Sequence, residues 1–182
     1  LGSNIDAGVT KTDTAKWGAE GFNPIGDYSN KFNGTFDGLG HTISDLYINR
    51  NSTTYVGLFG YINSSSTVKN IGLTNVDITG DFHVGGLAGE NNGLIQNSYS
   101  SGSVNGNEQV GGLVGRNWGG GRVQNSYATG NVTGNLYIGG LVGENYGTIS
   151  NSYASGTVTG NLYIGGLIGF LFGGTIENSY AS

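Results

Sequence analysis

The fold is decided by the stretch Ile138-Gly139-Gly140-Leu141-Val142-Gly143-Glu144-Asn145-Tyr146-Gly147-Thr148-Ile149-Ser150-Asn151-Ser152-Tyr153-Ala154-Ser155-Gly156-Thr157-Val158-Thr159-Gly160, which the chain writes four times with small changes. Its leucine recurs at spacings of 29, 26, 28 and 26 residues, as Leu58, Leu87, Leu113, Leu141 and Leu167. The tyrosine of its Asn-Ser-Tyr phrase recurs at spacings of 28, 26 and 27 residues, as Tyr99, Tyr127, Tyr153 and Tyr180. Because separate markers keep one period, the chain is predicted to be a repeat protein.

Each period contains three short strand candidates separated by glycine or asparagine. In the quoted copy they are 138–143, 149–154 and 156–160. No stretch has the three-to-four spacing of an amphipathic helix. Three sides of roughly nine residues each predict an all-β parallel β-helix, that is, a β-solenoid, whereas a propeller blade needs about 40 residues. We expect about six coils of 26–29 residues, wound right-handed like most crossover connections.

Alternation along the second strand predicts which side chains enter the core. It places Ile149, Asn151 and Tyr153 inward, and the small residues between them outward. The inward positions form three columns across the coils: aliphatic (Ile95, Val123, Ile149, Ile176), amide (Asn70, Asn97, Asn125, Asn151, Asn178) and aromatic (Tyr99, Tyr127, Tyr153, Tyr180). The amides are expected to hydrogen-bond along their column as a structural ladder, which satisfies buried polar groups.

The first strand does not fit strict alternation, because Val110 and Leu113 are three residues apart and Val114 follows directly. A bend at the intervening glycine pair would help to bury them, but the sequence does not place this corner or fix which face of the strand is buried. Glu90, Arg116 and Glu144 occupy equivalent places in consecutive coils, so we expect them to form exposed ion pairs, which contribute little stability.

Composition restricts the partners of the chain. It has 37 glycines, one proline and no cysteine, so collagen, disulfides and thiolate metal sites are excluded. The formal net charge is −5 and no basic residue follows Arg122, which argues against nucleic acid as a partner. No apolar run approaches the roughly 18 residues of a membrane helix, so no membrane insertion is expected.

Residues 1–35 do not follow the repeat and are interpreted as irregular coils or a cap before the solenoid of residues 36–182. The open end of a solenoid exposes unpaired backbone and apolar core, and a cap would cover both. The absence of methionine at position 1 suggests a segment of a longer chain.

The repeated phrases Gly-Leu-Val-Gly, Asn-Ser-Tyr-Ala and Gly-x-Val-x-Gly resemble the GLUG motif. Residues 21–26 and 35–43 also look like the stretch that opens such arrays. This resemblance, which covers nearly the whole chain, implies a β-solenoid in a large secreted bacterial protein. Examples are filamentous-haemagglutinin-like adhesins and the stalks of immunoglobulin A1 protease-like proteins. The expected location is therefore extracellular or at the bacterial cell surface.

No catalytic constellation is found. Neither His41 nor His83 accompanies a serine and an acid, and after Arg122 the only charges are Glu144 and Glu177. A polysaccharide-degrading enzyme would need clustered carboxylates or a cation site. The threonines are too irregularly placed for an ice-binding lattice. We therefore expect a non-enzymatic chain with no metal and no cofactor.

One row of residues is a candidate binding site. Trp118, Tyr146 and Phe172 share one turn position in three consecutive coils. Such an aromatic row could hold a glycan or a host surface protein, but the preferred interpretation is that the rings pack on one another and shield the corner. A second, mixed column contains Tyr55, His83, Gln109, Tyr137 and Tyr163.

Two hypotheses of function stay open: a structural or adhesive shaft, and a glycan- or protein-binding module. Flat, aligned columns would also permit end-to-end self-association of two chains.

Overall fold

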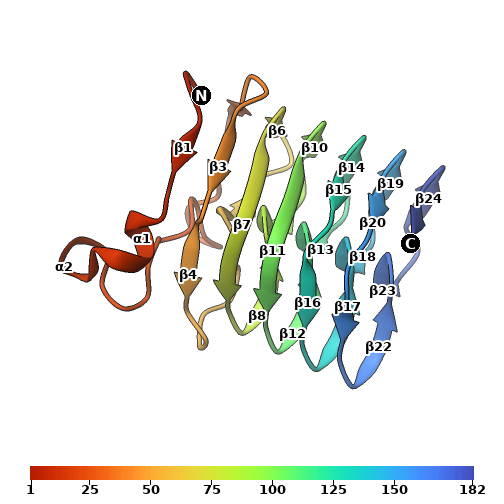
Figure 1. Ribbon diagram of the computed structural model, residues 1–182. Helices are drawn as coiled ribbons and strands as arrows, with labels where there is room; N and C mark the ends of the chain where they lie inside the picture. Colours follow the sequence, from red (N-terminus) through yellow and green to blue (C-terminus); the bar gives the residue numbers. More distant parts are fainter.

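The computed structural model describes all 182 residues and is a parallel β-solenoid. Its coils stand side by side from the N-terminal segment to the C-terminal coil, as Figure 1 shows from red to blue. Strands of successive coils pair in parallel and in register, for example Val123 with Ile95 on one side and with Ile149 on the other. The stack has about five turns, against about six expected.

Each coil contributes four or five short strands to four sheets, rather than three strands to three sides. The ten-stranded sheet contains β1 (Ile5–Asp6), β3 (Thr42–Ser44), β4 (Tyr47–Asn49), β7 (Gly72–Thr79), β11 (Tyr99–Asn105), β15 (Tyr127–Ala128), β16 (Asn131–Thr133), β20 (Tyr153–Ala154), β21 (Val158–Thr159) and β25 (Tyr180–Ala181). The six-stranded sheet contains β2 (Thr35–Asp37), β6 (Thr67–Lys69), β10 (Leu94–Gln96), β14 (Arg122–Gln124), β19 (Thr148–Ser150) and β24 (Thr175–Glu177).

The other two sheets arise from the first predicted strand, which the chain divides at its glycine pair. The four-stranded sheet contains β8 (Phe82–Gly85), β12 (Glu108–Gly111), β17 (Leu136–Gly139) and β22 (Leu162–Gly165). The five-stranded sheet contains β5 (Phe59–Ile62), β9 (Ala88–Asn91), β13 (Val114–Asn117), β18 (Val142–Asn145) and β23 (Ile168–Leu171). The corner, which the sequence left unplaced, falls between Gly111 and Val114, and it buries Val110, Leu113 and Val114 completely.

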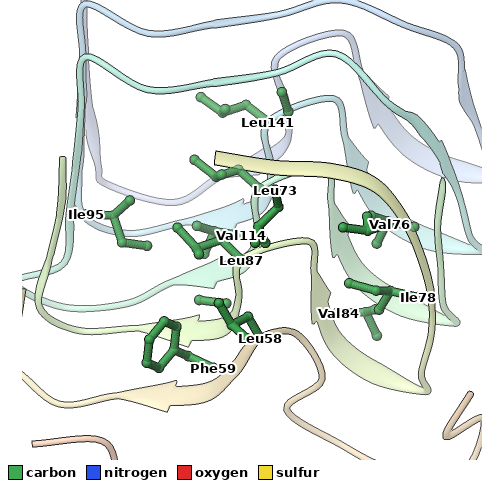
Figure 2. Close-up of a cluster of buried hydrophobic side chains, with 14 of the residues drawn as sticks. Leu58, Phe59, Leu73, Val76, Ile78, Val84, Leu87, Ile95, Val114 and Leu141 are labelled. Carbon is green, nitrogen blue, oxygen red and sulfur yellow. The ribbon is translucent and has the colours of Figure 1, made fainter. Parts of the chain in front are cut away.

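The core is aliphatic and runs through the stack (Figure 2). Ile95 lies on one side with Leu87 and Val114, while Val76, Ile78 and Val84 fill the other side of the cross-section (Figure 2). Of the predicted aliphatic column, Ile95, Val123 and Ile149 are fully buried, and only Ile176 in the last coil is exposed.

The predicted inward columns of asparagine and tyrosine are wrong in their orientation. Asn97, Asn125, Asn151 and Asn178 are exposed and Asn70 is partly exposed; the tyrosines are partly or fully exposed. Each of these asparagines has a positive φ, between 46° and 55°. This left-handed conformation suits asparagine and turns the chain, so alternation does not continue through it.

The residues that replace them inside are serines. Ser98, Ser126 and Ser152 are completely buried, although alternation placed them outside. Ser126 N donates to Ser152 Oγ at 3.2 Å, and Ser126 Oγ donates to the Gln124 carbonyl at 2.7 Å. The same two bonds recur around Ser98 and Ser152. A serine ladder therefore satisfies the buried backbone at this corner.

A buried amide ladder does exist, but at another corner of the coil. Asn91, Asn117 and Asn145 have no exposed surface. Asn91 Nδ2 donates to Asn117 Oδ1 at 2.8 Å, and Asn117 Nδ2 donates to Asn145 Oδ1 at 2.7 Å. Each amide also donates to the backbone of its own turn, which fixes the turn that follows.

Glycine allows the four- and five-stranded sheets to approach closely. A Cβ atom on Gly143 would lie 2.6 Å from Gln109 C, 2.6 Å from Val110 N and 2.7 Å from Gly115 O. Gly89, Gly115 and Gly169 meet the backbone of the preceding coil in the same way. The second glycine of the Gly-Leu-x-Gly phrase is thus required by packing in each of these coils.

The N-terminal segment lies at the start of the stack (Figure 1). It contains β1 and two single-turn helices, α1 (Val9–Thr12) and α2 (Thr14–Trp17). β1 pairs with β3, so the segment extends the ten-stranded sheet by one strand.

Candidate binding surface

Three columns of side chains form one continuous surface outside the four- and five-stranded sheets, which we call the outer strip. The first column is Tyr55, His83, Gln109, Tyr137 and Tyr163; the second is Tyr61, Glu90, Arg116, Glu144 and Phe170; the third is Trp118, Tyr146 and Phe172. Contacts between columns join them into one surface, for example Tyr137 with Phe170 at 4.9 Å between ring centroids. The two columns that the sequence suggested separately therefore belong to one surface.

The first column has an unusual backbone. All five of its residues have positive φ, between 50° and 65°. This region is uncommon for bulky side chains and costs about 1–3 kcal/mol per residue. The glycine of the next coil packs against the backbone here: Gly143 meets Gln109, and Gly169 meets Tyr137. The tight packing of the two sheets therefore holds the side chains of the first column in place within the outer strip.

The second column contains a chain of charges. Arg116 Nη1 lies 3.5 Å from Glu90 Oε2, and Arg116 Nε lies 3.3 Å from Glu144 Oε2. The predicted register of these residues is confirmed, but the prediction that they are exposed is wrong. Glu90 and Glu144 are 3% and 5% exposed, because the aromatic side chains around them exclude water. Arg116 Nε has no well-aligned acceptor, so these are charge contacts rather than ideal hydrogen bonds.

His83 extends this charge chain, with Nδ1 at 3.1 Å from Glu90 Oε2. Burial is the largest influence on the pKa of Glu90 and opposes its charged form. The contacts with His83 and Tyr61 and the charge of Arg116 together outweigh burial, so the pKa of Glu90 is below its ordinary value. Burial, with help from Glu90, raises the pKa of Tyr61 to about 12. Glu90 is therefore ionised and Tyr61 neutral at pH 7.

The third column is the predicted aromatic row. Its ring centroids are 4.2 Å apart between Trp118 and Tyr146, and 5.1 Å apart between Tyr146 and Phe172. The interplanar angles are 62° and 47°, so Trp118 and Tyr146 meet edge to face and Tyr146 and Phe172 are tilted, without parallel stacking. Trp118 and Phe172 are 37% and 58% exposed. The guanidinium carbon of Arg116 lies 3.7 Å from the centroid of a Trp118 ring, which joins this column to the charges.

The tyrosine ladder on the ten-stranded sheet differs in geometry. Tyr99, Tyr127 and Tyr153 stack at 4.8 Å with interplanar angles of 1° and 7°. Parallel stacking covers the ring faces and leaves only their edges to solvent. The neighbouring exposed asparagines are linked by hydrogen bonds along the stack; Asn125 Nδ2, for example, donates to Asn97 Oδ1 at 3.2 Å. The tyrosines and the asparagines therefore contact their equivalents in neighbouring coils. The tyrosine ladder presents no free ring faces to a ligand.

Sequence reasoning identified the third column but missed the second column as part of the same surface. The signal was the common register of Glu90, Arg116 and Glu144, two residues before the turn that carries Trp118 and Tyr146. Elsewhere, no group of three or more His, Cys, Asp or Glu residues is arranged to hold a metal ion. No helix of the protein is both long enough and apolar enough to span a membrane.

The stacked parallel sheets, in-register columns and repeated corners define a β-solenoid repeat protein. The GLUG motif matches residues 80–105, 106–133, 134–159 and 160–182, which is more than half of the chain, so the protein belongs to the GLUG motif family.

Two relatives are informative. Halomucin of Haloquadratum walsbyi is 45% identical over 117 residues, which are 63% of this chain and 1% of halomucin. A putative Gly-rich membrane protein of Evansella cellulosilytica is 39% identical over 134 residues, 55% of this chain and 16% of that protein. The chain thus spans a small part of the length of these relatives. No solved structure matches it.

Proposed function

We propose that the chain is a non-catalytic shaft in a secreted or cell-surface protein, like the stalk of an adhesin. One observation carries this proposal: the same residue columns pair in register from coil to coil along the stack. Such a structure grows by one strand spacing, about 4.8 Å, for each added coil. The similarity to halomucin and to a putative Gly-rich membrane protein supports a place at the cell surface.

A shaft requires interchangeable coils, and deletion of one coil tests this. Removal of residues 134–159 joins Thr133 to Gly160 at equivalent positions. We expect the shortened chain to fold, with its long dimension reduced by about 5 Å in solution scattering. Removal of residues 134–146 alone, half a coil, should abolish cooperative unfolding because the register is lost. A whole-coil deletion that unfolds as badly as the half-coil deletion contradicts the proposal.

The outer strip favours a second candidate function, the binding of a glycan along the solenoid axis. The rings of Trp118, Tyr146 and Phe172, of which the first and last are exposed, recur at 4.2 and 5.1 Å and can contact successive sugar rings. Two of the polar groups beside them are already bonded to Glu144: Tyr146 Oη donates to Glu144 Oε1 at 3.2 Å, and Gln109 Nε2 donates to Glu144 Oε2 at 3.3 Å. Binding would therefore depend on ring contact and favour neutral polysaccharides.

A glycan array tests this candidate with the variant Trp118→Ala/Tyr146→Ala. Two lost ring contacts at about 0.5–1.5 kcal/mol each should weaken binding roughly tenfold. The matched control is Tyr99→Ala/Tyr127→Ala, which removes two rings from the ladder on the other sheet and should bind normally. Equal loss in both variants, or no bound glycan with the protein folded, contradicts the candidate.

A further inference from the structure

The first coil has a turn that is longer than the equivalent turn of each later coil. Asn49 pairs with Thr79 and Val56 pairs with Val84, so these pairs mark the same corner in two successive coils. Six residues, 50–55, lie between the marks in the first coil, and four lie between them in each later coil. The later turns are 80–83, 106–109, 134–137 and 160–163. The first coil therefore has two additional residues at this corner.

The additional residues are Asn51 and Ser52, which form the tip of a tight turn. Thr53 N donates to the Arg50 carbonyl at 2.8 Å and closes this turn. The pairing between coils resumes at once, because the Thr53 carbonyl accepts from Asp81 N at 2.9 Å. Both tip residues are exposed, and their backbone N–H groups donate no hydrogen bond within the protein. The tip therefore projects from the solenoid and takes no part in its pairing.

The tip has the sequence Asn51-Ser52-Thr53, which matches the acceptor pattern Asn-x-Ser/Thr for N-linked glycans. Asn51 Oδ1 accepts only from Ser52 Oγ, at 3.5 Å, and Asn51 Nδ2 donates to no group of the protein. Asn97 and Asn125, in contrast, donate Nδ2 to the asparagine of the preceding coil. The side-chain amide of Asn51 is therefore available to an enzyme.

The same pattern occurs at three other places, where the fold restrains it. They are residues 33–35, 63–65 and 131–133. Asn131 lies in β16, which pairs with a strand on each side, and the adjacent Val132 is completely buried. Asn33 Oδ1 accepts from Ser65 Oγ at 2.9 Å, which joins the other two places to each other. Of the four, the turn at Asn51 can enter an active site without loss of a bond between coils.

We propose that Asn51 is the attachment site of an N-linked glycan. This rests on the proposed extracellular location, because the pattern is used in exported chains. An oligosaccharyltransferase supplies the sugar from a lipid-linked oligosaccharide diphosphate. The bond from the anomeric carbon to the diphosphate breaks, that carbon bonds to Asn51 Nδ2, and one amide proton and the lipid diphosphate are released. The bulky, hydrophilic glycan stands on a corner of the first coil, two coils before the aromatic row begins at Trp118.

Glycosylation of the purified, folded chain in vitro tests the proposal. The reagents are an oligosaccharyltransferase that accepts Asn-x-Ser/Thr and its lipid-linked donor, and glycopeptide mass spectrometry is the readout. We expect Asn51 to be modified and Asn131 to remain unmodified, whereas a free peptide of residues 128–136 should be modified because no strand pairing restrains it. A folded chain with Asn51 unmodified, or with Asn131 modified as fully as Asn51, overturns the proposal. This assay does not depend on export, so its failure is distinct from failure of the proposed extracellular location.

Two substitutions of Thr53 provide matched controls. Thr53→Ser keeps the hydroxyl group and should keep the modification. Thr53→Val keeps the size of the side chain but removes the hydroxyl group, and it should abolish the modification although Asn51 is unchanged. Modification of Thr53→Val to the level of the native chain overturns the proposal. Chain recovered from outside its producing cells should also carry a glycan at Asn51, and an unmodified Asn51 there likewise overturns it.

Discussion

Replacing Gly143 by alanine is expected to destabilise the protein by about 3 kcal/mol or more. The added Cβ would lie 2.6–2.7 Å from backbone atoms of Gln109, Val110 and Gly115. Backbone on both sides cannot move aside as the end of a flexible side chain could, so the four- and five-stranded sheets must separate. The effect should appear as a large fall in the denaturant concentration at the unfolding midpoint.

Gly120→Ala is the matched control. Gly120 has no neighbouring heavy atom within 4 Å of an added Cβ and no positive φ. The same substitution there should leave the midpoint unchanged or raise stability by about 0.4–1 kcal/mol. If both variants unfold at similar denaturant concentrations, the close packing of the two sheets is not a determinant of stability.

Replacing Arg116 by methionine is expected to cost about 3–5 kcal/mol at pH 7, because it removes the guanidinium that lies between two buried carboxylates. Methionine keeps much of the apolar stem, so the loss reports mainly the charge. Arg122→Met is the control, since Arg122 is exposed and forms no ion pair. The triple change that also replaces Glu90 and Glu144 by glutamine should recover most of the stability; no recovery would contradict the charge explanation.

The loss of unfolding free energy in Arg116→Met should become smaller at low pH. In the native chain the pKa of Glu90 is lowered, so its contribution to stability is present above the ordinary glutamate pKa and is lost as pH falls through the lowered value. Without Arg116, one of the influences that lower the pKa of Glu90 is lost. The difference in unfolding free energy between the two proteins should therefore shrink as the pH falls below about 4. A difference that is constant from pH 7 to pH 3 would exclude a role for these charges.

The sequence was sufficient for the class of fold because its period is visible in several columns at once. It was also sufficient for the register of Glu90, Arg116 and Glu144, which needs only equivalent positions, but it did not place the corner at the glycine pair. It was not sufficient to predict which side chains of the second strand face the core. Asn125 and its equivalents take a left-handed conformation, and alternation ends at such a residue.

The candidate surface was predicted only in part for a related reason. Exposure of Glu90 depends on the aromatic side chains of neighbouring coils, and no single repeat contains this information. Likewise, Tyr137 and Gln109 give no sign in sequence of a positive φ, because that conformation is imposed by packing of the next coil's glycine.

The turn after the buried amide ladder has a consequence for how such proteins diversify. In the pairing, Leu94 meets Arg122 and Asn91 meets Asn117, so Gly119 and Gly120 are two additional residues in the turn of the later coil. The coils on either side remain in register despite this insertion. The length and sequence of this one loop can therefore change in any coil during evolution, while the strand register of the solenoid is kept. Related chains would then differ in the surface they show rather than in their architecture.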